Sequence, residues 1–269
     1  MNERVANILS IAGSDPSGGA GIQADLKAIS ANGGYGMAVL TGLTAQNTQG
    51  VQGVELVAPA LVAAQVKSIR DDIRVDAVKI GMLGTAEIIE AVARALDGLD
   101  APVVLDPVMV AKGGDRLLRS EAVAALRDVL LPRATVITPN LPEAADLLGE
   151  AEAQDVEAME GQARALLDLG ARAVLLKGGH MAEGEAVDLL CEGGGMTRLR
   201  APRHYTRNTH GTGCTLSSAL ATWLGRGNDL RQAAAKAKDY IGVAIGAADD
   251  LQVGQGHGPV HHFHALWRD

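Results

Sequence analysis

Short runs of β-branched residues alternate along this chain with longer segments rich in alanine and leucine at helical spacing. Parallel strands that are buried on both faces and joined by crossover helices give this pattern. It therefore predicts an α/β fold with a mostly parallel central sheet. The predicted strands are Asn7–Ala12, Gly36–Thr44, Asp76–Ile80, Pro102–Leu105, Thr135–Thr138 and Ala173–Leu176.

Helix starts are predicted in the gaps between these strands. Proline suits the first helical position, and acidic side chains suit the positive end of the helix dipole. The residues that fit are Pro59, Thr85 with Glu87, Ser120 with Glu121, and Pro142 with Glu143.

The last third of the chain has a different pattern. Ala186–Cys191 and Thr197–Leu199 flank the glycines at 193–195, which predicts an antiparallel hairpin at the edge of the sheet. Two helices, about Gly213–Leu224 and Asp229–Asp249, are predicted to close the chain. Because the sequence has no internal repeat, low-complexity linker or break in composition, we expect one domain spanning residues 1–269.

Composition and charge exclude several function classes. The 32 acidic residues outnumber the 24 basic ones, and aromatic residues make up only 2% of the chain. We therefore expect no nucleic-acid partner, since such a protein needs positive charge and rings for base stacking. The apolar runs are strand-sized, so no membrane span is expected. The two cysteines and the lack of a secretory signal pattern favour a cytoplasmic protein.

Polar or glycine-rich turns follow six predicted strands. In open parallel sheets, ligands bind beyond the carboxyl ends of the strands, so the six turns together predict one shared site. Each turn alone is weak evidence, because strand-to-helix turns favour such residues for conformational reasons. The turns are Gly13–Gly21, Gln46–Thr48, Gly81–Met82, Asp106–Val108, Asn140–Glu143 and Lys177–His180.

The first of these turns fits part of a dinucleotide-binding fingerprint, with Gly19, Gly21 and Ala24 in the required order. The acidic residue that should bind the ribose about 20 residues later is missing, which disfavours a nicotinamide enzyme. No Gly-Lys-Ser/Thr follows either, so a Walker P-loop is excluded. A flexible connecting turn stays open as an alternative, although its glycine density is costly unless backbone approaches a ligand.

A second glycine cluster, Asn208–Cys214, directly precedes an apolar helical segment. Converging N–H groups and the helix dipole make such a turn a suitable oxyanion or phosphate cradle. Cys214 would lie in the first helical turn, where a thiolate is favoured. The alternative is a cysteine that only fills space in the core, which is our interpretation of Cys191.

Oxygen and ammonium groups at the strand ends suit a phosphorylated ligand. Asp106 and the Asn140–Glu143 pair supply oxygen ligands of the kind that Mg²⁺ takes alongside water and polyphosphate. Helix capping is the alternative for Asp106 and for the Asn140–Glu143 pair. Lys177 and Lys238 are candidates to neutralise phosphate charge, and Lys177 is the stronger because it ends an apolar strand before two glycines.

Histidines gather near the C-terminus, at positions 257, 261, 262 and 264. A zinc site would need acidic or cysteine ligands near these histidines and ligands at a helical spacing. The segment has neither feature. We therefore do not expect zinc there.

Eight ordered motifs, which span nearly the whole chain, resemble one family. The chain resembles the hydroxymethylpyrimidine/phosphomethylpyrimidine kinases of thiamine biosynthesis, within the ribokinase-like superfamily. The motifs are AGSDPSGGAGIQADLK (Ala12–Lys27), AQNTQGVQ (Ala45–Gln52), KIGMLG (Lys79–Gly84), VLDPVMVAKGGD (Val104–Asp115), TPNLPEA (Thr138–Ala144), KGGH (Lys177–His180), NTHGTGCTLSSALA (Asn208–Ala221) and GPVHHF (Gly258–Phe263).

The resemblance implies a three-layer α/β/α sandwich, commonly a homodimer, that uses ATP and Mg²⁺. It implies phosphorylation of 4-amino-5-hydroxymethyl-2-methylpyrimidine, followed by a second transfer onto the monophosphate to give the pyrophosphate. The implied pyrimidine pocket consists of Gly13, Asp25, Thr44, Gln46, Met82 and Val108. The implied nucleotide and catalytic residues are Asp106, Asn140, Glu143, Lys177, Thr209, Gly211, Thr212, Gly213, Cys214 and Lys238, with Asp106 and Glu143 on the Mg²⁺ side.

Two positions depart from relatives in the superfamily. Ribokinase-like sugar kinases end the anion-binding turn with an aspartate base, whereas this chain has Cys214. This resembles the pyrimidine kinases and some pyridoxal kinases, with the thiolate accepting the hydroxymethyl proton or orienting that hydroxyl. Thr44 stands where many relatives are expected to have an aliphatic residue.

The alternatives are a pyridoxal kinase and a non-catalytic regulatory protein that binds nucleotide. Gln46 favours the aminopyrimidine, because an amide can pair with a ring nitrogen and the neighbouring exocyclic amine. Pyridoxine presents a phenolic oxygen in place of that amine, which would leave polar groups of the site unpaired.

Overall fold

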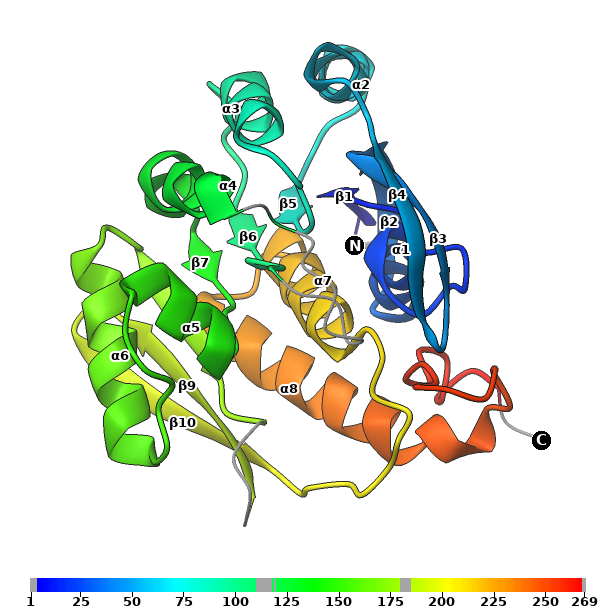
Figure 1. Ribbon diagram of the computed structural model, residues 1–269, viewed down its shortest axis with the longest axis vertical. Helices are drawn as coiled ribbons and strands as arrows, with labels where there is room; N and C mark the ends of the chain where they lie inside the picture. Colours follow the sequence, from blue (N-terminus) through cyan, green and yellow to red (C-terminus); the bar gives the residue numbers. More distant parts are fainter. Residues whose placement is uncertain (1–3, 110–117, 119, 180–184, 268–269) are drawn as a thin grey trace.

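The computed structural model describes residues 4–109, 118, 120–179 and 185–267. An eight-stranded sheet runs through the centre in the order β10-β9-β8-β7-β6-β5-β1-β2, and β3 and β4 form a separate two-stranded sheet (Figure 1). The strands are β1 (Ala6–Ala12), β2 (Gly34–Leu40), β3 (Gly42–Asn47), β4 (Gly50–Leu56), β5 (Ala77–Ile80), β6 (Val103–Leu105), β7 (Val136–Ile137), β8 (Ala173–Lys177), β9 (Ala186–Glu192) and β10 (Gly195–Ala201).

The sheet is parallel except at one edge. β2, β1, β5, β6, β7 and β8 pair in parallel, so their carboxyl ends point the same way. β9 and β10 pair antiparallel, which confirms the predicted edge hairpin. The predicted α/β class with a mostly parallel sheet is confirmed.

Helices cover both faces of this sheet. One layer contains α1 (Gly21–Ala31), α7 (Thr212–Gly225) and α8 (Leu230–Gly246). The other contains α2 (Pro59–Asp72), α3 (Ala86–Ala95), α4 (Ser120–Ala125), α5 (Leu141–Leu148) and α6 (Val156–Asp168), which lie in sequence along the sheet in Figure 1. The described residues also form a π-helix (Leu126–Leu130) and two 3-10 helices (Leu131–Arg133 and Ala248–Asp250).

Each face of the sheet has its own apolar core. Leu9, Ile11 and Leu105 pack under the α2–α6 layer, whereas Ile8 and Val104 pack under α1, α7 and α8. Side chains alternate between the two faces of a strand, so neighbouring strand residues enter different cores. The result is a three-layer α/β/α sandwich.

The helix starts agree with the sequence. α2 begins at Pro59, Thr85 caps α3 by accepting a hydrogen bond from the N–H of Ile88, and α4 begins at Ser120. None of the helices within the described ranges combines the length and apolar character that crossing a membrane requires.

The predicted strand Gly36–Thr44 is wrong. The chain leaves the main sheet after Leu40 and enters the small sheet at Gly42. Between them, the N–H of Thr41 donates to Ala12 while its hydroxyl donates to the carbonyl of Met82, and these bonds hold a bend. A Cβ at Gly42 would lie 3.1 Å from Cε of Met82, so the bend suits glycine. β4, the partner of β3, was not predicted.

Candidate active site

Three of the six polar turns predicted to share a site meet at the carboxyl edge of the central sheet. Asp106 follows β6, Asn140 follows β7, and Lys177 ends β8. Lys177 also forms an isolated bridge with Asn140, so these turns are directly paired. The parallel sheet therefore brings residues far apart in sequence into one cluster.

Lys177 is the centre of a buried charged cluster. Its ammonium lies 3.0 Å from Oδ1 of Asp106 and 3.8 Å from Oε2 of Glu143. Thr138 and Ser217 donate further hydrogen bonds to Asp106, at 3.0 and 3.3 Å. Burial opposes both charges, but the ion pair outweighs it, lowering the pKa of Asp106 and raising the pKa of Lys177. Both groups are therefore charged at neutral pH.

Glu143 has two roles in this cluster. Its side chain accepts from the N–H of Asn140 at 2.8 Å, and the Asn140 side chain accepts from the N–H of Glu143 at 2.8 Å. This capping box starts α5, so the capping interpretation of both residues is confirmed. Burial raises the pKa of Glu143 to about 7, with Lys177 opposing the rise. Near pH 7 the protonated and the ionised form of this carboxyl are therefore both populated.

The glycine turn before α7 lies directly beside Lys177. Gly211 caps the helix with φ +76°, and a Cβ there would overlap the carbonyl oxygen of Gly19. A Cβ at Gly213 would lie 3.2 Å from Nζ of Lys177 and 3.5 Å from Asp106. The first N–H groups of a helix have no intrahelical partner, so the turn can accept an anion next to the ammonium. Thr209 supports the turn, since its carbonyl accepts from the Thr212 hydroxyl at 2.8 Å.

Cys214 corrects one expectation. The first turn of α7 was expected to favour its thiolate, but burial raises the pKa of Cys214 to about 11. Lys79 acts against this rise, whereas the carboxylates of Asp25 and Asp106 add to it. At neutral pH the residue is therefore a thiol, because desolvation and like charge outweigh the helix terminus.

A second buried ion pair lies behind the turn. Nζ of Lys79 is 2.8 and 2.9 Å from the two oxygens of Asp25, and neither side chain is exposed. Ser10 and Ser218 donate to the same carboxylate. The Asp25 carboxylate is therefore buried and already accepts from Lys79, Ser10 and Ser218. Its contact with substrate stays a prediction, and it would require the substrate to replace one of these donors.

The other pocket residues come together between β1 and the small sheet. A Cβ at Gly13 would overlap Cε of Met82, at a distance of 2.5 Å. Gly13 and Met82 are therefore packed directly against each other. Thr44 donates to the carbonyl of Ser14 at 2.9 Å. Gln46 lies within β3, not after a strand as expected, at a break in the β3–β4 register that can redirect its side chain.

Val108 and Lys238 come from different parts of the chain, the segment after β6 and helix α8. Val108 follows Asp106 directly and is half-buried. Lys238 is buried on α8, 2.7 Å from Asp188, whose other oxygen accepts from the N–H of Gly178 at 3.0 Å. Lys238 therefore supports the turn after Lys177, and a direct phosphate contact stays a prediction.

Sequence reasoning missed several buried polar residues of the site. Asp15 and His210 form a pair 2.8 Å apart that joins the two glycine turns. Lys79 could have been found, because a lysine within the apolar run of β5 requires a buried partner. Two motif portions, residues 110–115 and His180, lie outside the described residues.

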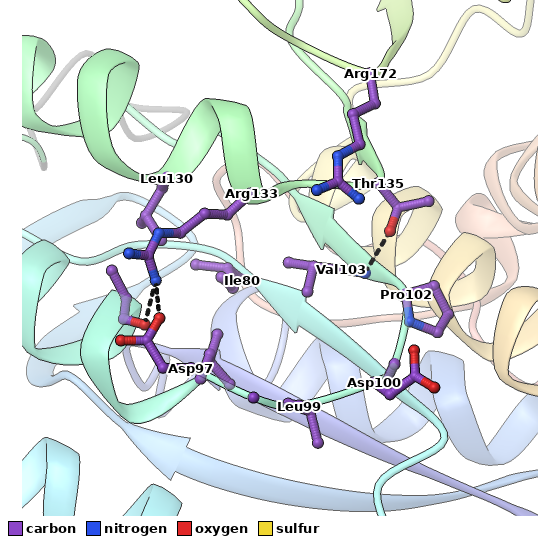
Figure 2. Close-up of a pocket in the computed structure, with 14 residues that line it drawn as sticks. Ile80, Asp97, Leu99, Asp100, Pro102, Val103, Leu130, Arg133, Thr135 and Arg172 are labelled. Carbon is purple, nitrogen blue, oxygen red and sulfur yellow. Dashed lines mark hydrogen bonds and ion pairs between the residues drawn. The ribbon is translucent and has the colours of Figure 1, made fainter.

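A separate cavity of about 510 Å³ lies at the other end of the sheet. Figure 2 shows it at the beginnings of β6, β7 and β8, where Arg133 points to Asp97 and Thr135 accepts from the N–H of Val103. Arg172 and Asp100 also line it. It shares none of the site residues named above.

The donor set fits Mg²⁺ shared with a phosphate chain. In the part of the chain that the structure describes, no three acidic, histidine or cysteine side chains gather to hold a metal unaided. Asp106 and Glu143 do converge on the same ammonium. Mg²⁺ commonly takes one or two carboxylates together with water and substrate phosphates.

The sandwich and its anion-binding turn define a kinase with the ribokinase-like fold. Among solved structures, an ADP complex of Bacillus subtilis pyridoxal kinase superposes with a TM-score of 0.90 at 40% identity, covering 98% of this chain and 100% of that one. The phosphomethylpyrimidine kinase of Clostridium difficile 630 superposes with a TM-score of 0.78 at 42% identity, covering 89% and 99%.

Sequence comparison is more specific than the fold. The model of the family described as phosphomethylpyrimidine kinase matches residues 15–261, and the chain belongs to that family. The hydroxymethylpyrimidine/phosphomethylpyrimidine kinase of Rhizobium meliloti (strain 1021) is 55% identical over 261 residues, covering 97% of this chain and 98% of the relative. The resemblance stated from the motifs is confirmed.

Proposed function

We propose that this protein transfers a phosphoryl group from ATP to 4-amino-5-hydroxymethyl-2-methylpyrimidine and then to the monophosphate, giving the pyrophosphate in thiamine biosynthesis. The carrying observation is that Lys177, Asp106 and the Gly211–Cys214 turn adjoin one another at the strand ends. Family membership supports the substrate class. The pyridoxal kinase of similar fold binds ADP, which supports a nucleotide as the phosphoryl donor.

Phosphoryl transfer depends on positioning and on charge neutralisation. In the proposed mechanism, Lys177 and the N–H groups of Gly213 and Cys214 bind the phosphate oxygens. The carboxyl groups of Asp106 and Glu143 would hold Mg²⁺. Bound Mg²⁺ would supply positive charge to the phosphate chain. Cys214, as a thiol, orients the hydroxymethyl group. Because the transition state is loose, the hydroxyl proton can leave after the new P–O bond has begun to form, and it passes to an oxygen of the transferred phosphoryl group while ADP departs.

An ADP-release assay tests this function. Purified enzyme is given ATP and Mg²⁺ with the aminopyrimidine alcohol, its monophosphate or pyridoxal. We expect turnover of the first two and a lower kcat/KM for pyridoxal, because Gln46 can pair with the aminopyrimidine edge. Gln46→Leu should reduce that preference by about tenfold, the cost of unpairing one buried polar group, and spare ATP binding. Better turnover of pyridoxal, or none of the monophosphate, would refute the corresponding step.

A cytoplasmic homodimer built from one catalytic domain per chain completes the proposal. Its support is the resemblance, which implies a homodimer, together with the composition of the chain. Light scattering on the purified protein should give about twice the chain mass of 27.7 kDa. A monomer at working concentration would refute the dimer and leave the proposed reaction untouched.

A further inference from the structure

Lys177 and Asp188 lie directly opposite each other where β8 pairs with β9. In the same register Leu175 faces Leu190, and both side chains enter the core beneath α1, α7 and α8. Lys177 is two residues after Leu175, and Asp188 is two residues before Leu190. Because side chains alternate between the two faces of a strand, Lys177 and Asp188 share that face. An ammonium and a carboxylate in such a cross-strand position lie within reach of each other.

These two opposite charges nevertheless do not pair. The ammonium of Lys177 lies 3.0 Å from Oδ1 of Asp106 and 3.8 Å from Oε2 of Glu143. The carboxylate of Asp188 is bound instead by Lys238 of α8, with 2.7 Å between Oδ2 and Nζ. Lys177 therefore points away from the carboxylate opposite it and towards the anion-binding turn.

Asp188 is a buried carboxylate that needs a cation. It is 4% exposed, and Lys238 is 7% exposed. Its Oδ1 accepts from the N–H of Gly178 at 3.0 Å, but an amide N–H carries no full charge. Among the described residues, Lys238 is the one cation that forms an ion pair with Asp188. A buried carboxylate without a cation is costly, so Asp188 would attract another ammonium within reach.

Two lysines thus neutralise two buried carboxylates on this face of the sheet. Lys238 pairs with Asp188, and Lys177 pairs with Asp106. Removal of Lys238 would leave Lys177 between two carboxylates, one of them directly opposite on the neighbouring strand. The flexible four-carbon stem of a lysine allows its ammonium to turn to either.

We propose that Lys238 is a positioning residue for Lys177: it neutralises Asp188 and so prevents that carboxylate from capturing the ammonium of Lys177. The inference rests on the proposed function, in which Lys177 binds phosphate. Lys238 then acts on the reaction indirectly, through Asp188, and its own ammonium need not touch the nucleotide.

Three variants test this role through kcat/KM for ATP. Lys238→Met removes the ammonium and leaves an apolar side chain of similar length among the apolar residues of α8. We expect a loss of about 10²-fold, since the charge beside the transferring phosphoryl group is withdrawn. Asp188→Asn breaks the same ion pair but removes the competing charge, so its loss should be at least about tenfold smaller. The double variant should be at least about tenfold more active than Lys238→Met.

The pattern of losses separates this role from two others. Equal losses in the two single variants would show that the ion pair is only structural. A loss in Lys238→Met that Asp188→Asn does not rescue would show that Lys238 itself contacts the phosphate. Either result, or full activity of Lys238→Met, would overturn the inference. Lys236→Met, at an exposed position of the same helix, is the matched control and should change kcat/KM less than about twofold.

Melting curves establish whether each variant folds. If Lys238→Met does not fold, Asp188→Asn and the double variant still decide, because they differ only at position 238 and both have a neutral side chain at position 188. We expect their kcat/KM values to agree within about threefold, since Lys238 has no charge left to neutralise there. A further loss of about 10²-fold in the double variant would show direct phosphate contact and overturn the inference.

A crystal structure of Lys238→Met without substrate shows the position of Lys177 directly. We expect Nζ of Lys177 within hydrogen-bond distance of Asp188 and no longer on Asp106. A Lys177 that stays on Asp106 would overturn the inference, whichever substrate the enzyme uses. A wild type that does not phosphorylate the aminopyrimidine refutes the proposed function instead.

Discussion

Cys214 lies between two opposing effects at the start of α7. The helix terminus favours the thiolate, whereas burial and two nearby carboxylates favour the thiol and raise its pKa to about 11. The residue type and its place after Gly213 could be predicted from the sequence. The protonation state of Cys214 could not be predicted, because one of the carboxylates that raise its pKa, Asp25, belongs to a different helix, α1.

We expect alkylation of Cys214 in the free enzyme to accelerate about tenfold per pH unit between roughly pH 7 and 9. Only the thiolate reacts, and its fraction grows tenfold per unit well below the pKa. Iodoacetamide labelling followed by mass spectrometry of the Cys214 peptide measures the rate, with buried Cys191 as the internal reference. A rate that levels off near pH 7 would show a low-pKa thiolate instead.

Long-range side-chain pairs separate what sequence can predict from what it cannot. Asp106, Glu143 and Lys177 were expected together because they belong to segments at the ends of parallel strands, and the sheet aligns these ends. Asp15 and His210 are 195 residues apart and lie in loops whose paths no periodicity describes. Their pairing depends on how two glycine turns pack, which only the folded chain determines.

At the scale of elements, the β3–β4 hairpin was the least predictable part of the fold. The run from Gly36 to Thr44 reads as one strand, and the bend at Thr41 depends on hydrogen bonds to Ala12 and Met82. By contrast, β1 and β5 to β8 are apolar runs between strong turn residues. Such strands are buried on both faces and are visible in the sequence.

The C-terminal segment is the element that ties the site together. The N–H groups of Gly256 and His257 donate to Thr48 in the β3–β4 turn, at 3.1 and 2.8 Å. Gly258 then donates to Asn208 at 3.1 Å, just before the anion-binding turn. The histidine-rich tail thus has a structural role, with His262 3.0 Å from the hydroxyl of Thr215 in α7.

His262 should make this element sensitive to acid. Burial, with Lys27 and His261 adding, lowers its pKa to about 3. The unfolded chain protonates near the ordinary value of about 6.5, so stability is present above that pH and is lost as pH falls towards 3. Between pH 7.5 and 5.5 this residue alone removes about 1.4 kcal/mol.

Urea unfolding at the two pH values measures this loss. His262→Asn should be less stable than wild type at pH 7.5 but should lose less on acidification, because it lacks the titrating group. Other titratable residues are shared by both proteins and cancel in the comparison. Equal losses in both proteins would show that His262 does not control the acid sensitivity.

At the scale of the whole molecule, the parallel sheet gives the protein two chemically different ends. The carboxyl ends carry the Lys177 cluster and the anion-binding turn. The amino ends carry the cavity of Figure 2, where the charges of Arg133 and Asp97 are already paired. A cavity alone therefore does not locate the chemistry, whereas the direction of the strands does.

β8 allows both ends to be tested on one strand, since Arg172 directly precedes it and Lys177 is its last residue. Lys177→Ala should lower kcat/KM for ATP by about 10²-fold or more, because it removes a preorganised charge beside the transferring phosphoryl group. Arg172→Ala, which alters only the Figure 2 cavity, should change it less than about twofold. Steady-state kinetics on both variants measures the change, and melting curves confirm that both fold. A large loss of kcat/KM in Arg172→Ala, with little loss in Lys177→Ala, would contradict this assignment of the two ends.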